Sequence, residues 1–135
     1  GFTGDLDELL RPGVAVAIGH PDLGSVGKEA KDILTRKGIY DKVVAATAMM
    51  LPDSKGLSGV LREGRVDVVL NWKAVLHVSD NAQFMECIPI SEGYARPQLL
   101  SMAVTTFSKH QSEAVQFLEL CSSPKGREVF ARHGF

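Results

Sequence analysis

The sequence has few of the residues and patterns that mark specialised classes of protein. Its 135 residues include two cysteines, Cys87 and Cys121, which lie too far apart to form the close pair typical of a zinc site. They are either free thiols or, in an oxidising compartment, one disulfide. Lys and Arg (15) nearly balance Asp and Glu (16), so nothing suggests a nucleic-acid partner. No apolar run is long enough for a membrane span, and no signal sequence stands in this chain.

Motifs of catalysis and nucleotide binding are also absent. The sequence has neither a G-x-x-x-x-G-K-[ST] phosphate loop nor a G-x-S-x-G nucleophile elbow. The four histidines are not spaced as metal ligands, and His20 has the context of a polar loop residue. We therefore expect no enzymatic activity, no metal held by the protein and no cofactor.

What is present is the composition of a globular α/β domain. Hydrophobic residues make up 44% of the chain and charged residues 23%, which is typical of a soluble domain with a core. Apolar runs predict buried strands at residues 14–19, 42–47 and 66–70. Apolar residues at helical spacing predict helices over residues 25–37 and 54–62. Buried strands that alternate with helices indicate a parallel sheet.

The second half of the chain follows a different pattern. Residues 86–90 and 99–106 are predicted as further strands, separated by a loop. A helix is predicted from residue 108 to about 121, with Ser108 as its cap, and a last helix starts at Ser123 and Pro124.

The loop between the first predicted strand and helix is the most informative segment. It ends in Gly24, Ser25, Val26 and Gly27, and Ser25 is a candidate cap for the helix that follows. A helix start directs backbone N–H groups and the positive end of its dipole outward, so such a loop can hold an anion. An ordinary strand-to-helix connection is the alternative interpretation.

Four segments carry a pattern that spans nearly the whole chain. They are A-I-G-H-P and V-G-K-E-A within residues 17–30, G-V-L-R-E-G-R-V-D-V-V at 59–69, I-P-I at 88–90, and residues 114–135, which end in H-G-F. Together they resemble the second half of a type 2 periplasmic binding protein, and most closely the molybdate- and tungstate-binding proteins of ABC importers. The last segment is the least specific, because it recurs across many extracellular solute-binding proteins.

The resemblance implies an architecture and a function. The expected fold is a three-layer α/β lobe with a mixed sheet flanked by helices. Residues 1–96 resemble a complete second lobe, and residues 97–135 resemble a return strand and two helices that normally complete the first lobe. The chain would then be a fragment that supplies half of an oxyanion site. It would act in the periplasm or outside the cell, free or lipid-anchored, with the membrane permease of an ABC importer.

The resemblance also implies individual binding residues. The two backbone N–H donors of the second lobe fall at Val26 and Ser54, with Ser25 and Gly27 beside the first, and Gly27 would allow close approach of the ligand. Ser54 is also a candidate cap for its helix. The family's aromatic hydroxyl falls at Trp72, whose indole N–H has a different reach. The ligand would be a metal oxyanion such as molybdate or tungstate.

Several alternatives remain open at this level. Trp72 can instead form a lid or a partly buried edge of the core, with Asn71 and Lys73 as rival donors. The same fold also serves as the ligand-sensing domain of transcriptional regulators, and an α/β enzyme without a recognisable site is a third class. The return strand and last helices lack a partner lobe, so they should expose apolar faces, repack, or pair in a homodimer or swapped dimer.

Overall fold

The computed structural model describes all 135 residues, which form two compact units, Gly1–Pro97 and Gln98–Phe135. The first unit has the predicted α/β class. Its sheet contains three parallel strands, β1 (Val16–Gly19), β2 (Met49–Leu51) and β3 (Val68–Val69), in the order β2-β1-β3. Every residue of the central strand β1 is buried, which explains its continuous apolar sequence. The strands at 14–19 and 66–70 are thus confirmed in shortened form.

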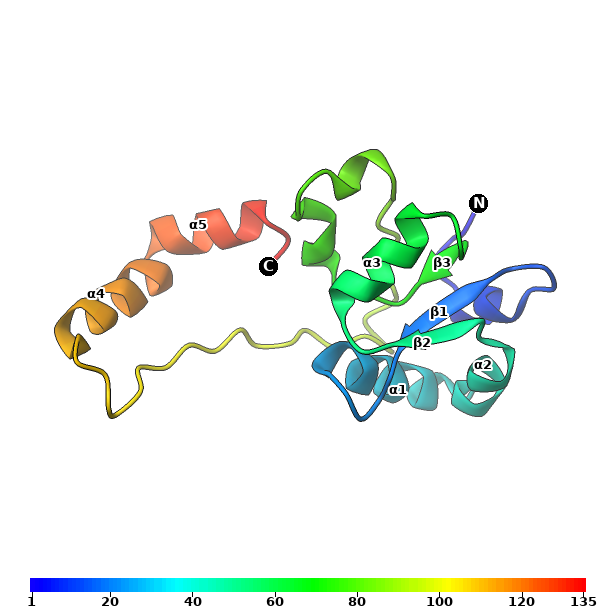
Figure 1. Ribbon diagram of the computed structural model, residues 1–135, viewed down its shortest axis with the longest axis horizontal. Coiled ribbons are helices and arrows are strands. Elements are labelled where there is room, and N and C mark those ends of the chain that lie inside the picture. Colours follow the sequence, from blue (N-terminus) through cyan, green and yellow to red (C-terminus); the bar gives the residue numbers. More distant parts are fainter. The chain divides into compact units, whose positions relative to one another are not determined.

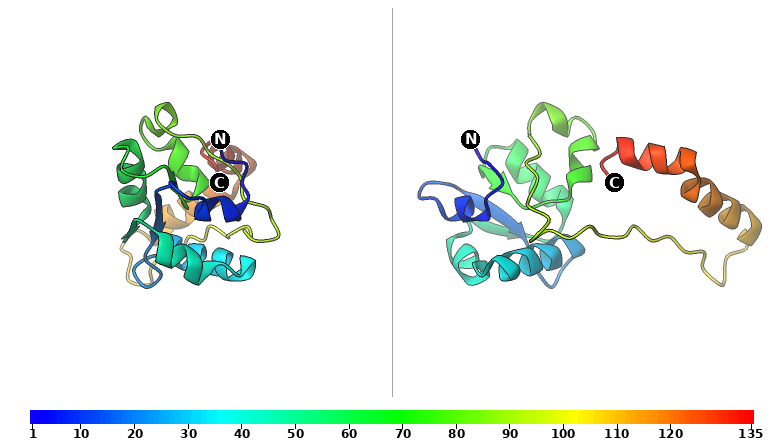
Figure 2. Two further views of the ribbon diagram at one scale, coloured as in Figure 1. Left: turned by 90° about the vertical axis from the view of Figure 1, so that its right-hand side faces the viewer. Right: turned by 180° about the vertical axis from the view of Figure 1, so that it is seen from behind.

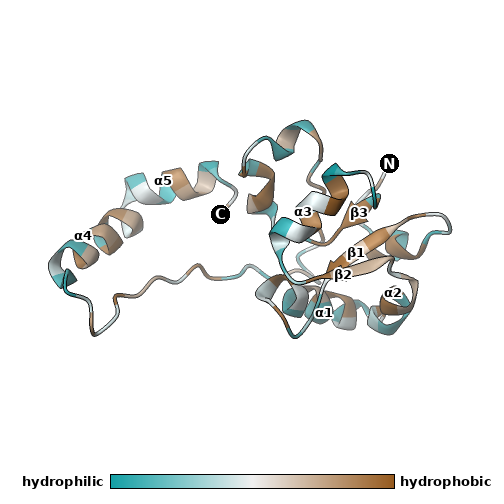
Figure 3. Ribbon diagram, in the orientation of Figure 1, coloured by the Kyte–Doolittle hydropathy of each residue, from teal (hydrophilic) through white to brown (hydrophobic).

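Helices cover both faces of this sheet, as Figures 1 and 2 show. Helices α1 (Ser25–Lys37) and α2 (Tyr40–Ala46) lie against one face, and α3 (Ser54–Arg62) lies against the other. The hydrophobic residues concentrate along the strands and the inner sides of the helices (Figure 3). The first unit therefore has three layers, with the sheet in the middle.

The bounds of α1 and α3 follow the sequence closely. Ile33 and Leu34 are buried in the core, at the apolar spacing that predicted α1. The helix ends at Gly38, whose φ of 80° is left-handed and whose N–H donates to the carbonyls of Leu34 and Thr35. The cap of α3 is Glu63, and the next residue, Gly64, is left-handed with φ 66°. Both predicted helices are confirmed.

The strand predicted at 42–47 is wrong, because this segment forms α2 and the strand comes later, as β2. Val43 is completely buried and lies four residues from the buried Ile39, which places both on one face of the helix. The adjacent pair Val43 and Val44 suggested a strand by its β-branched side chains. Burial of one helix face outweighed that local preference.

The strands predicted at 86–90 and 99–106 do not form. Both segments run without regular secondary structure, so the antiparallel members of the expected mixed sheet are absent and the sheet is entirely parallel. A strand needs a partner backbone to satisfy its N–H and C=O groups, and no strand of the chain pairs with either segment. Leu99 is 95% exposed, so the apolar character of the second segment reflects no burial within the chain.

Three short 3-10 helices complete the first unit: η1 (Leu6–Leu10), η2 (Lys73–His77) and η3 (Asn81–Gln83). The segment from η2 to η3 is tied down by the buried side chain of Asn81, whose Nδ2 donates to the Val75 carbonyl at 2.8 Å. Arg62 at the end of α3 forms an ion pair with Asp80 at 3.2 Å. These contacts hold the segment after β3 against α3.

The end of α1 anchors the N-terminal segment. Lys37 Nζ lies 2.9 Å from Asp7 and 3.4 Å from Asp5. The hydrogen bond with Asp7 raises the pKa of Lys37. The Asp7 backbone N–H, which donates to Asp5, lowers the pKa of Asp5. Arg36 Nε also donates to the Tyr94 carbonyl at 2.6 Å. One helix end therefore holds two segments that are distant in sequence.

The second unit contains α4 (Gln111–Ser122) and α5 (Pro124–Arg132), preceded by an irregular segment. The predicted cap Ser108 is wrong, because α4 begins after His110. The last helix starts at Pro124 as predicted, and Ser123 is its cap: the Ser123 Oγ accepts from the Gly126 N–H at 3.1 Å. No residue of either helix is buried. No helix of the chain is both long enough and apolar enough to cross a membrane.

Candidate ligand-binding site

The carboxyl ends of the three parallel strands meet at one edge of the sheet, where binding sites of α/β proteins form. Each strand leads directly to a predicted binding residue. The loop after β1 leads to Val26, the loop after β2 leads to Ser54, and the chain after β3 leads to Trp72. The topology therefore brings together, at this edge, three segments that are far apart in the sequence.

The first helix start differs from the predicted one in its cap. Gly24 is the cap of α1, and Ser25 is the first helical residue, so the capping role expected of Ser25 is wrong. Glycine has no side chain to accept a hydrogen bond, and no side chain caps the first turn. The first-turn N–H groups of Ser25, Val26 and Gly27 therefore have no acceptor supplied by a cap. This helix start is free of acidic side chains in its first turn.

Gly27 is required where α1 packs on the end of β1. A methyl group added at this position would lie 2.0 Å from the His20 carbonyl oxygen and 2.7 Å from the carbonyl carbon of Gly19. Close packing of α1 on β1 therefore explains why glycine stands at this position, a reason that the sequence alone did not reveal. Contact between Gly27 and a ligand stays a prediction. Val26 is only 5% exposed, so its backbone can face a ligand while its side chain is part of the core.

The second helix start has a charged cap. Asp53, and not Ser54, is the cap of α3, so the capping role expected of Ser54 is also wrong. Asp53 Oδ1 accepts from the Gly56 N–H at 2.7 Å. Ser54 is the first residue of the helix, and its N–H does not take part in the hydrogen bond to Asp53. The carboxylate of Asp53 partly offsets the positive dipole at this end of α3.

The two helix starts are neighbours because the loops before them are in contact. A methyl group added at Gly24 would lie 2.8 Å from the Pro52 carbonyl oxygen, so glycine permits the two backbones to approach. The His20 N–H also donates to the Leu51 carbonyl at 2.8 Å, which joins the ends of β1 and β2. N–H donors from α1 and α3 are therefore held at one edge.

Trp72 lies in the same part of the unit. It is half-buried and packs against a core cluster that includes Val26 and Leu57. Its backbone N–H donates to Asn71 Oδ1 at 2.9 Å. The structure therefore places Trp72 after β3, at the same edge of the sheet as the two helix starts. Whether its ring contacts a ligand, forms a lid or serves only as an edge of the core stays a prediction.

The rival donors have different environments. Asn71 Nδ2 donates to the Ser54 carbonyl at 3.0 Å and to Ser58 Oγ at 3.3 Å, so its amide is engaged within the protein. Lys73 is exposed, as are Lys28 and Lys55 in the first turns of α1 and α3. These lysines provide positive charge around the edge.

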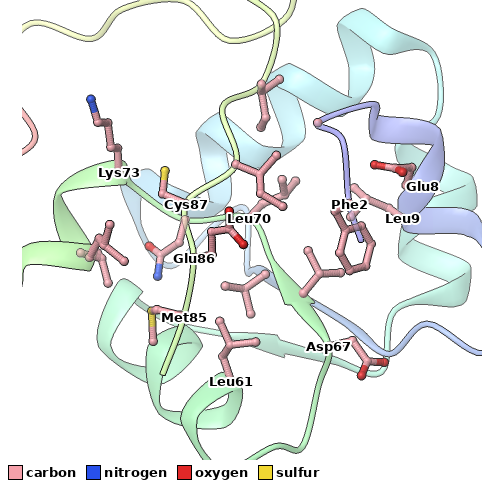
Figure 4. Close-up of a pocket in the computed structure, with 18 of the residues that line it drawn as sticks. Phe2, Glu8, Leu9, Leu61, Asp67, Leu70, Lys73, Met85, Glu86 and Cys87 are labelled. Atoms are coloured by element: carbon pink, nitrogen blue, oxygen red, sulfur yellow. The ribbon is translucent and has the colours of Figure 1, made fainter. Parts of the chain in front are cut away.

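A separate cavity of about 410 Å³ lies beside β3, next to the site. Figure 4 shows Phe2, Leu61 and Leu70 among the apolar side chains around it. Trp72 and Lys73 also line it, but neither Val26 nor Ser54 does. Four carboxylates and one lysine are the charged side chains of its lining: Asp5, Glu8, Asp67, Glu86 and Lys73. The excess of negative charge makes this cavity unsuitable for an oxyanion.

Other candidate residues have local roles. His20 Nδ1 accepts from the Asp22 N–H at 3.3 Å, which is the turn role expected of a polar loop histidine. Asp67, in the segment that resembles the binding-protein family, accepts from the Ala15 N–H at 2.7 Å and so fixes β3 beside β1. Cys87 and Cys121 are free thiols and are partly buried.

Comparisons with known proteins identify the family of the chain. Residues 2–135 match the family described as bacterial extracellular solute-binding proteins. A Bacillus subtilis strain 168 protein, YvgL, is 24% identical over 120 residues and is named as a substrate-binding lipoprotein of an ABC transporter. The match covers 89% of this chain and 45% of YvgL, so the chain spans less than half of the length of that relative. Because the family match extends over almost every residue, the chain belongs to the bacterial extracellular solute-binding proteins.

Proposed function

We propose that the chain is part of the solute-binding component of an ABC importer and binds a small oxyanion, such as molybdate or tungstate, at the starts of α1 and α3. Family membership and the name of the relative support the transport role. The observation that most favours an anion is the start of α1, whose first-turn N–H groups lack a side-chain cap and lie beside a second helix start. The transcriptional-regulator alternative has no support from either comparison.

In this proposal the backbone supplies the donors. The N–H groups of Val26 and Ser54 donate to ligand oxygens, with Ser25 and Gly27 beside the first. Trp72 covers the apolar side of the site. Backbone donors suit an oxyanion because the helix fixes their direction and they carry no competing negative charge.

The expected affinity of this chain is low. A charge at a helix end contributes about 0.3–1 kcal/mol, and up to about 2 kcal/mol in a partly buried geometry. Two helix ends therefore contribute at most about 4 kcal/mol, which corresponds to a dissociation constant on the order of 1 mM. Tight binding requires further donors, which a second lobe would provide by closing on the ligand.

The partner and the location follow from the same proposal. A solute-binding component delivers its ligand to the membrane permease of the importer, and it does so in the periplasm or at the outer surface of the cell. In this proposal residues 1–96 form the lobe that carries the donors, and residues 97–135 complete the opposite lobe. With 15 basic and 16 acidic residues, no electrostatic feature indicates nucleic acid.

Substitution of Ser54 by proline tests the donor role directly. Proline has no N–H but is favoured at the first position of a helix, and the residue before it is already extended, with φ −152° and ψ 171° at Asp53. Ser54→Pro should therefore keep the fold and remove the donor, whereas Ser54→Ala keeps the N–H and is the matched control.

The affinity for molybdate and tungstate is measured by NMR titration at constant ionic strength. A hydrogen bond to a charged group contributes about 1.5 kcal/mol, so Ser54→Pro should weaken binding about tenfold while Ser54→Ala binds as the parent chain does. Equal affinity of the two variants would contradict the proposed donor. Sub-micromolar binding by the monomeric parent chain would contradict the claim that donors are missing.

A further inference from the structure

Asn71 joins two of the residues on which the proposed site depends. It follows β3 directly, precedes Trp72 in the chain and reaches the first turn of α3. We propose that Asn71 is a positioning residue that holds Trp72 and the start of α3 in one fixed arrangement. Its effect on ligand binding rests on the proposed function, whereas its effect on Trp72 does not.

Both halves of the Asn71 amide are engaged. Nδ2 donates to the Ser54 carbonyl at 3.0 Å and to Ser58 Oγ at 3.3 Å, and Oδ1 accepts from the Trp72 N–H at 2.9 Å. An amide is the only short side chain that offers an N–H donor and a carbonyl acceptor together. This excludes Asn71 as a ligand donor in this arrangement and makes it a bridge between two backbone segments.

Ser58 completes the bridge from within the core. It is only 6% exposed, and its Oγ–H donates to the Ser54 carbonyl at 2.9 Å. The Ser54 carbonyl thus accepts two side-chain hydrogen bonds, one from the same helix and one from the segment after β3. These two bonds hold the first turn of α3, which begins with the Ser54 N–H.

Trp72 is held at both its backbone and its ring. Asn71 accepts from its N–H, and the ring packs against the cluster that contains Val26 and Leu57. This cluster includes Val26 of α1 and Leu57 of α3, so the ring packs against a part of the core to which both donor-carrying helices contribute. A change at Asn71 should therefore alter the environment of Trp72 without any direct contact with a ligand.

The first test needs no ligand. Trp72 is the only tryptophan of the chain, so fluorescence excited selectively at tryptophan reports this residue alone. In Asn71→Ala, loss of the three side-chain hydrogen bonds should shift the emission of Trp72 to longer wavelength and increase its quenching by acrylamide. In Ser58→Ala, the bond from Asn71 to Ser54 remains, so the emission should stay close to that of the parent chain. An unchanged emission in Asn71→Ala would overturn the inference.

A second variant gives a readout that a general loss of stability would not produce. Asn71→Asp keeps an oxygen for the Trp72 N–H but loses the donor toward Ser54. When the introduced carboxyl is protonated, its O–H can donate to the Ser54 carbonyl again. The emission should therefore return toward that of the parent chain as the pH falls from 7.5 to 4, while Asn71→Ala shows no such recovery. Absence of recovery in a folded Asn71→Asp protein would contradict the donor role.

The third test separates this inference from the proposed function. In Asn71→Ala, the affinity for molybdate should fall about two- to tenfold, the range expected for a donor that is held less firmly. If the emission shifts but the parent chain itself binds no oxyanion, the positioning role stands and the proposed function fails. If the parent chain binds and Asn71→Ala binds equally well with an unchanged emission, the function stands and the positioning role fails.

Discussion

Replacing Gly27 by alanine should disrupt the contact between α1 and β1, which sets the position of the first helix start. The added methyl group would lie 2.0 Å from the oxygen and 2.4 Å from the carbon of the His20 carbonyl, and 2.7 Å from the Gly19 carbonyl carbon. All of these are backbone atoms, so no side-chain rotation can relieve the clash. We expect α1 to move away from the strand end.

The magnitude follows from two opposing effects. Overpacking in a dense interior costs typically about 1–3 kcal/mol, and rigid neighbours place this site at the upper end. Alanine is favoured over glycine in a helix by about 1 kcal/mol. The free energy of unfolding should therefore fall by about 2 kcal/mol, which lowers the Tm of a domain of this size by roughly 10 °C.

Gly59 in α3 provides the matched control, because no heavy atom lies within 4 Å of the position where its side chain would begin. Gly59→Ala should raise the free energy of unfolding by about 0.5–1 kcal/mol. Urea denaturation, followed by the fluorescence of the only tryptophan, measures both variants. If Gly27→Ala is as stable as Gly59→Ala, the close packing of α1 on β1 is refuted.

Three further predictions concern charge, pH and association. Asp53→Asn keeps the acceptor for the Gly56 N–H but removes a negative charge. Repulsion between nearby charges in water costs about 1 kcal/mol, so the affinity for molybdate in an NMR titration should rise about fivefold. An unchanged affinity would place the anion elsewhere. Folding lowers the pKa of Asp5 and raises the pKa of Lys37. The contribution of this pair to stability should therefore be lost as the pH falls through the folded-state pKa of Asp5, and also as the pH rises through the folded-state pKa of Lys37. NMR signals of Asp5 and Lys37 that do not change in these acidic and alkaline ranges would contradict this prediction. The second unit buries none of its helical residues, so the chain should bind a hydrophobic dye or elute as a dimer, and a monomeric protein without dye binding would instead indicate repacking.

The fold of the first unit was predictable where local and global preferences agree. The bounds of α1 follow from its apolar face, its basic last turn and the left-handed Gly38 that ends it. The same agreement made α3 predictable. At α2 the preferences conflict, because Val43 and Val44 favour a strand locally while burial of Val43 requires a helix. The spacing of Ile39 and Val43 was the signal that could have identified this helix.

The missing strands had a different cause. An apolar, β-branched segment forms a strand only where another backbone can pair with it, and pairing depends on residues far away in the sequence. The patterns at 86–90 and 99–106 therefore indicated segments that could form strands. No strand of this chain pairs with either of them. Nothing local in either segment reveals that absence.

The candidate site was predictable at the level of segments but not of contacts. Strand order and direction bring Val26, Ser54 and Trp72 to one edge, as a parallel sheet requires. The observed cap of each of these helices lies one residue before the predicted cap. Sequence patterns do not resolve a difference of one position. The bridge made by Asn71 was not predicted, since its partners lie 13 and 17 residues away.

The most direct test of the account is an NMR titration of the 15N-labelled chain with tungstate, with chloride as the control at equal ionic strength. The backbone amide signals of Val26, Gly27 and Ser54 should shift together and saturate in the millimolar range, because both helix starts donate to one anion. No saturable shift at these amides, or shifts confined to residues around the cavity beside β3, would contradict the claim that the two helix starts form the binding site.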